Sequence, residues 1–172
     1  MHAVPRLHEA RGRRNRSNVR VRLGARNLEQ CGVSNAVNRP EWLVRVVAVQ
    51  ENVPDSCFIV GIAEDEYGEG RYLTLQSGLE EPGEQERRLG LDSYCVVNET
   101  GGVHYGGIES VALSADQISF RFTSEAVGAL SLPDQEMTLD IAPGSDVQNL
   151  RDGLRRVLTY GNPDKFPAEL HI

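Results

Sequence analysis

The sequence predicts an α+β protein, with an antiparallel sheet of about six or seven strands and one long C-terminal amphipathic helix packed on a face. Three observations lead to this prediction. Short apolar segments with two-residue alternation follow one another between turn residues. The clearest helical periodicity lies near the C-terminus, in residues 145–160. Strands and helices do not alternate regularly along the chain, so a parallel sheet is not indicated.

The predicted sheet is centred on a hairpin in residues 57–76. Residues 57–63 (CFIVGIA) are all apolar or small, which is typical of a strand buried on both faces. Residues 71–76 alternate between apolar and polar side chains. The turn between these strands is strongly acidic, and two glycines allow it to be tight. Its carboxylates belong to Glu64, Asp65, Glu66 and Glu69.

The other expected strands have the same alternating pattern and are bounded by turn residues. They are residues 42–50, 93–98, 103–105, 108–113, 117–123 and 137–141. Gly106 and Gly107 indicate a bulge or kink. Ala115 and Asp116 predict a hairpin turn. The polar stretch 77–92 contains no convincing strand and has room for one short helical turn.

Two helices are expected in the C-terminal half. A short one covers residues 124–130, with Ser124 as N-cap. For the long one, Ser145 and Gln148 form a capping box and Gly161 ends the helix. Its apolar stripe consists of Val147, Leu150, Leu154, Val157 and Leu158.

The charge distribution divides the chain into three parts: residues 1–40, a folded domain at 41–161 and a C-terminal tail at 162–172. Residues 1–40 hold nine arginines against two acidic residues, a charge of +7, and the remainder holds nine basic and 23 acidic residues, a charge of −14. Residues 1–40 lack periodicity, which predicts disorder. The alternatives are a nucleic-acid arm, which would lack aromatic residues to stack on bases, and a true start near Trp42.

The composition favours a cytoplasmic protein that binds neither membranes nor, through its acidic domain, nucleic acids. No apolar run approaches the roughly 20 residues of a membrane span, and no secretory signal precedes the domain. The three cysteines, Cys31, Cys57 and Cys95, are an odd number without CxxC spacing, which favours reduced thiols.

No catalytic residue, cofactor or metal site is expected. The chain lacks the GxSxG, HExxH, Walker and dinucleotide motifs. The acidic turn does not match a calcium-binding EF-hand loop. One enzymatic alternative remains, because a hairpin over residues 93–105 would put His104 opposite Val97 and on the same face as Cys95. A thiolate–imidazole pair with Tyr105 beside it would then be possible.

The acidic turn is also a candidate protein-binding site, because Tyr67 lies among its carboxylates and an aromatic anchor within a polar rim is typical of interfaces. The candidate partner-binding residues are Glu64, Asp65, Glu66, Tyr67, Glu69, Arg71, Asp92, Tyr94 and Tyr105. The alternatives are a solvated turn and, for the tyrosines, half-buried sheet positions.

Four stretches resemble the immunity protein 10 family of bacterial polymorphic toxin systems. They are GIAEDEYGEGRYLTLQ (61–76), LGLDSYCVV (89–97), HYGGIESVAL (104–113) and LRDGLRRVL (150–158). The resemblance covers about residues 43–160. It implies a cytosolic α+β immunity protein that is encoded beside a toxin, binds the cognate toxin domain and neutralises it by occlusion, without catalysis or a cofactor. The chemistry of the toxin does not follow from it.

A small enzyme, or a small-molecule binding module with a pocket at Cys95, His104 and Tyr105, is the alternative function. An adjacent toxin gene would favour the immunity protein. Low reactivity of the Cys95 thiol would count against the alternative.

Overall fold

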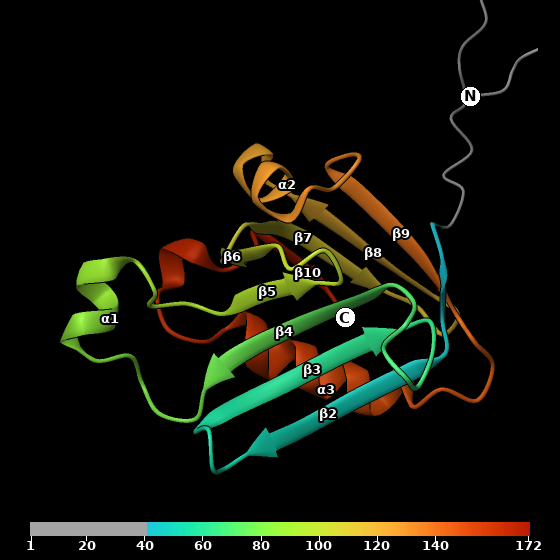
Figure 1. Cartoon of the computed structure of the whole chain (residues 1–172), viewed down its shortest axis with the longest axis horizontal. Helices are drawn as coiled ribbons and strands as arrows, with labels where there is room; N and C mark the ends of the chain where they lie inside the picture. The colour runs from blue at the N-terminus through green and yellow to red at the C-terminus, as the bar shows by residue number, and fades with distance from the viewer. Residues whose placement is uncertain (1–40) are drawn as a thin grey trace, which may run out of the picture. The chain divides into compact units, whose positions relative to one another are not determined.

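The computed structural model describes residues 41–172 and has the predicted α+β class, with two five-stranded sheets and three α-helices (Figure 1). Sheet A has the spatial order β1 (Leu43–Val44), β9 (Glu136–Ile141), β8 (Gln117–Phe122), β7 (Ile108–Leu113), β10 (Glu169–His171). Sheet B has the order β2 (Val46–Asn52), β3 (Cys57–Ala63), β4 (Tyr72–Gly78), β5 (Cys95–Asn98), β6 (Val103–Tyr105). The helices are α1 (Glu84–Leu89), α2 (Ser124–Leu130), α3 (Val147–Leu158) and the 3₁₀ turn η1 (Pro163–Lys165).

The prediction of a single sheet was wrong because the chain changes sheet at two points that the hydrophobic pattern does not reveal. Residues 42–50 alternate as if they were one strand, but β1 pairs with β9 in sheet A and β2 pairs with β3 in sheet B. The second change follows β6, at Gly106 and Gly107, whose φ angles are +73° and +84°. The expected kink at these glycines is therefore a passage between sheets.

The last eleven residues, set apart above as a C-terminal tail, belong to the same folded unit. β10 pairs in parallel with β7 at the edge of sheet A. Arg155 donates a hydrogen bond from Nη2 to the carbonyl oxygen of Ile172 at 2.6 Å. The predictions for residues 1–40 lie outside the described residues.

Several local predictions are confirmed. The hairpin of β3 and β4 lies in the middle of sheet B, and a short helix, α1, occurs in the polar stretch after it. The helix α2 has the expected bounds, and α3 buries four of the five residues of its apolar stripe. The expected end of α3 at Gly161 was wrong, because the helix ends at Leu158 and its C-cap is Thr159, two residues before the glycine.

The predicted N-caps are each displaced by one residue. In α2 the cap is Thr123, whose Oγ1 accepts a hydrogen bond from the Ala126 amide at 3.2 Å. In α3 the cap is Asp146, whose carboxylate accepts one from the Asn149 amide at 3.0 Å. Thr123 directly precedes Ser124, and Asp146 directly follows Ser145. Serine, threonine and aspartate are all good N-cap residues, so the residue types do not identify the cap, and the backbone geometry determines which residue takes that position.

The hydrophobic core lies against one face of sheet B, where α3 contacts β2, β3 and β4 (Figure 1). On β3, Phe58, Val60 and Ile62 are buried, whereas the alternate residues are half-buried. The prediction that β3 is buried on both faces was therefore wrong, because its second face is only half-buried. Within residues 41–172 no helix is long and apolar enough to span a membrane.

Candidate functional site

The loop that joins β3 to β4, residues 64–71, is called the acidic loop. The Asp65 carboxylate organises it from within, because it accepts backbone hydrogen bonds from Tyr67 at 2.8 Å, Glu69 at 3.3 Å and Gly70 at 2.5 Å. These bonds, above all the one from Tyr67, hold the pKa of Asp65 below its ordinary value. The carboxylate thus substitutes for the backbone acceptors that a regular turn would supply.

An ion pair closes the base of the acidic loop. Glu64 Oε2 accepts hydrogen bonds from the backbone amide of Arg71 at 2.9 Å and from its Nε at 3.1 Å, and Oε1 accepts one from Nη2 at 3.0 Å. The hydrogen bonds from the Arg71 side chain are the main cause that lowers the pKa of Glu64. This two-point contact is the strong geometry for arginine and carboxylate. Arg71 therefore stabilises the loop through its backbone amide, Nε and Nη2.

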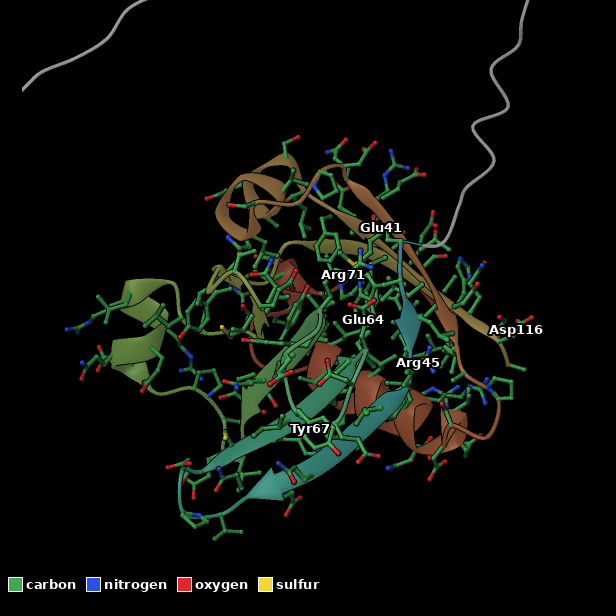
Figure 2. All side chains as sticks on the ribbon, turned by 45° about the vertical axis from the view of Figure 1, so that its right-hand side comes forward. Glu41, Arg45, Glu64, Tyr67, Arg71 and Asp116 are labelled. Carbon is green, nitrogen blue, oxygen red and sulfur yellow. The ribbon has the colours of Figure 1, made fainter. Side chains whose placement is uncertain are left out.

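Three candidate residues of the acidic loop remain available at its surface. Tyr67 is 85% exposed, and Glu66 and Glu69 flank it and are exposed. Among residues 41–172 neither Glu66 nor Glu69 has a side-chain ion-pair or hydrogen-bond partner. Figure 2 shows the loop with Tyr67 in front of the strands of sheet B, on the opposite side from α3. An exposed aromatic ring, with free carboxylates on either side of it in the sequence, is thus displayed on a turn that internal hydrogen bonds hold.

Two predicted partner-binding residues are structural instead. Tyr94 is completely buried, and its hydroxyl accepts a hydrogen bond from the Ile108 amide at 3.1 Å. Burial raises the pKa of Tyr94 to about 12. The buried Asp92 carboxylate accepts hydrogen bonds from Lys165 Nζ at 2.8 Å and Asn162 Nδ2 at 3.1 Å. Of the candidates outside the acidic loop, only Tyr105 reaches the surface, at 36% exposure.

The Asp92 contacts predict a pH dependence of stability. The hydrogen bond from Lys165 is the main cause that lowers the pKa of Asp92 below the ordinary 3.8. A carboxyl with a depressed folded-state pKa stabilises the fold above its unfolded pKa, and this contribution disappears as the pH falls through the folded pKa. We expect Asp92→Asn to be less stable than wild type above about pH 4, with the difference narrowing below it.

Urea unfolding between about pH 2 and pH 6 measures this difference. Glu66→Gln, at a carboxylate without a described partner, is the control and should track wild type throughout. A constant difference between Asp92→Asn and wild type across this range would contradict the expectation.

The predicted pairing of Cys95 with His104 was wrong. In the β5–β6 hairpin His104 lies opposite Val96, and Cys95 lies opposite Tyr105. This register differs by one residue from the expected one, and a one-residue shift places a side chain on the other face of the sheet. The thiol and the imidazole therefore point to opposite faces. Burial also raises the pKa of Cys95, which favours the unreactive thiol form.

A groove of about 570 Å³ lies beside β6, η1 and β10, and His104 and Tyr105 line it, but Cys95 does not. Its two cations are already engaged. Lys165 contacts Asp92 and donates to the Gly90 carbonyl at 2.6 Å, and Arg121 pairs with Glu109 at 3.4 Å. In the part of the chain that the structure describes, no group of three or more His, Cys, Asp or Glu residues is placed to hold a metal ion.

A comparison with known protein families gives a match over most of the described residues. The family model described as Immunity protein 10 matches residues 43–148, which extend from β1 to the first turn of α3 and include the acidic loop. No similar protein was found among curated protein sequences. Because the matched region is more than half of the 172 residues, the chain belongs to the immunity protein 10 family.

Proposed function

We propose that this chain is an immunity protein that binds a cognate bacterial toxin domain and neutralises it by occlusion, without catalysis and without a cofactor. It acts in the cytoplasm of the cell that makes the toxin. Membership of the immunity protein 10 family supports a protein partner. The acidic loop supplies a binding element of the required kind, and the separation of Cys95 from His104 argues against the enzymatic alternative.

The observation that carries the proposal is the exposure of Tyr67 on a loop whose conformation is held by half-buried, hydrogen-bonded carboxylates. Tyrosines are enriched among the residues that dominate interface energies, because one ring buries a large apolar area at a small cost in side-chain entropy. A loop that is already ordered loses little further freedom when it binds. The hydrogen bonds to Asp65 and the Glu64–Arg71 pair provide this order.

The charge of the domain indicates which toxins it would attract. Residues 41–172 carry a charge of −14, since nine basic residues oppose 23 acidic ones. A negative field speeds encounter with a basic partner and disfavours acidic ones. If the toxin is a nuclease, its basic active site would accept Glu66 and Glu69 in the positions that phosphates take.

Neutralising Glu66 and Glu69 together as glutamines is expected to slow association with the toxin domain about tenfold at low salt, because steering charge is lost at the contact site. The difference should shrink as added salt screens exposed charges. The unfolding midpoint should stay unchanged, since neither side chain has a described partner. Stopped-flow mixing with a catalytically inactive form of the toxin domain encoded beside this chain measures the rate.

The matched control is Glu86→Gln with Glu125→Gln, which removes the same charge from exposed positions outside the acidic loop that have no described side-chain hydrogen bond or ion pair. It should slow association much less. Equal slowing by the two double variants would mean that only the net charge matters. The acidic loop would then lose its place in the proposal.

A further inference from the structure

The face of sheet B opposite α3, called the open face, contains no charged residue. Its side chains alternate along each strand with those that enter the core. The open face consists of Val46, Ala48, Gln50 and Asn52 on β2, Cys57, Ile59, Gly61 and Ala63 on β3, Tyr72, Thr74, Gln76 and Gly78 on β4, Cys95 and Val97 on β5, and Val103 and Tyr105 on β6. An uncharged surface across five strands is unusual for a sheet face turned to water.

Sheet A provides the comparison within the same chain. Its strands present the charged residues Glu109, Arg121, Glu136 and Asp140 away from the core. Arg121 pairs there with Glu109 and Glu136, as expected of a solvated surface. The fold thus has one charged and one uncharged outer sheet face. Depletion of charge is the compositional feature of the centre of a protein interface.

The strand register makes the open face continuous. One row of directly opposed residues crosses all five strands, from Gln50 through Ile59, Gln76 and Cys95 to Tyr105. The neighbouring row begins with the small residues Ala48, Gly61 and Thr74 and continues to Val97 and Val103. At Gly61 an added Cβ would meet only Ala48 Cβ and Thr74 Oγ1, each at 3.9 Å.

Carboxylates border the open face at both ends of its strands. The acidic loop and Glu99 lie at one end, and Asp55, Glu80 and Glu81 lie at the other, all in turns or loops of sheet B. Tyr67 lies in front of the strands on this side of the sheet (Figure 2). The open face therefore has the layout of an interface, with an uncharged centre of apolar and polar side chains inside a polar rim, and the rim is negative.

We propose that the open face, together with the acidic loop, is the surface on which the toxin domain docks, and that the toxin presents an apolar patch ringed by basic residues. This inference rests on the proposed function and adds the surface and the chemistry of the partner to it. The carboxylates at both strand ends select a basic rim, and the uncharged rows between them select an apolar centre. The charged outer face of sheet A lacks both features.

Gly61→Val tests the proposal by filling the open face without disturbing the fold. The added Cβ meets only ordinary contacts on its own face, and valine suits a strand better than glycine does. Its unfolding midpoint should equal or exceed that of wild type. Its affinity for the inactive toxin domain encoded beside this chain, measured by calorimetry, should fall tenfold or more. Ala112→Val, at an exposed position on β7 of sheet A, is the matched control and should leave the affinity unchanged.

Val103→Asp is a second variant, and its expected effect comes from charge and not from added volume. Val103 is 50% exposed on the edge strand β6. A carboxylate placed on the uncharged open face would lose its water on binding, so a fall of tenfold or more is expected. Ala112→Asp adds the same charge on sheet A and should have little effect.

The outcomes separate this inference from the function on which it rests. Failure of the wild-type chain to bind the toxin domain overturns both. Normal binding by Gly61→Val and Val103→Asp overturns the docking surface and leaves the immunity function standing. A third outcome also overturns the docking surface: the wild-type chain forms a homodimer, and the two variants lose the dimer but still bind the toxin domain. The open face would then bind a second copy of the chain.

Discussion

Tyr67→Ala is expected to weaken binding of the toxin domain by about 30- to 100-fold, because aromatic anchors at interface centres contribute about 2 kcal/mol or more and each 1.4 kcal/mol is a factor of ten. Tyr67 is 85% exposed in the chain alone, so it contributes no core packing that the substitution could remove. The unfolding midpoint should therefore stay within experimental error of wild type. Calorimetry with the inactive toxin domain measures the affinity.

Tyr67→Phe separates the ring from its hydroxyl and should retain most of the affinity if buried apolar area dominates. Asp65→Ala keeps Tyr67 but removes the acceptor of the loop's backbone hydrogen bonds. It should weaken binding by a smaller factor, because the loop must then be ordered on binding. An affinity of Tyr67→Ala equal to that of wild type would exclude the acidic loop as the anchor.

Gly161→Ala is expected to reduce the free energy of unfolding by about 3 kcal/mol or more, the range of severe backbone and packing defects. Gly161 has a φ of +76°, which L-residues rarely adopt. Its added Cβ would overlap the carbonyl oxygen of Asp92 and lie 2.9 Å from the carbonyl carbon. This carbonyl also accepts a hydrogen bond from the Asn162 amide at 2.7 Å, so it cannot move away freely.

Gly144→Ala is the matched control for this prediction. Gly144 has a similar φ of +89°, but no atom lies within 4 Å of its added Cβ. Only the conformational cost of about 1–2 kcal/mol should appear there. Urea unfolding of both variants isolates the steric part as their difference. Equal destabilisation by Gly161→Ala and Gly144→Ala would show that residues 92 and 161 are not held in contact. The chain after α3 would then not be packed against Asp92.

The sequence predicted those elements whose signals are local. The apolar segments that became β3 and β4 and the helical stripe of α3 each lie within a single element, and the presence of these elements was confirmed. The division into two sheets was missed because it depends on partners far away in sequence. β1 pairs with β9, and β10 pairs with β7, each in parallel. Nothing in the composition of such short strands specifies the strand that they join.

The candidate site was predicted in part for the same reason. Tyr67 and its acidic neighbours are prominent in the sequence. Which carboxylates accept hydrogen bonds within the loop, and which stay free, depends on where the backbone amides point in the folded loop. Asp65 and Glu64 are engaged, whereas Glu66 and Glu69 are free of described partners. The burial of Tyr94 depends on how sheet B packs, and the pairing of His104 with Val96 instead of Val97 depends on the register of its strands. The open face became visible only when five strands were placed side by side.

The most direct test of the central claim is survival of bacteria that express the neighbouring toxin domain in its active form, with and without this chain. We expect the wild-type chain to restore growth and to co-purify with the toxin domain, and we expect Tyr67→Ala to restore growth less well at equal protein level. Killing that the wild-type chain does not relieve, with no complex recovered, would contradict the claim that this chain neutralises that toxin.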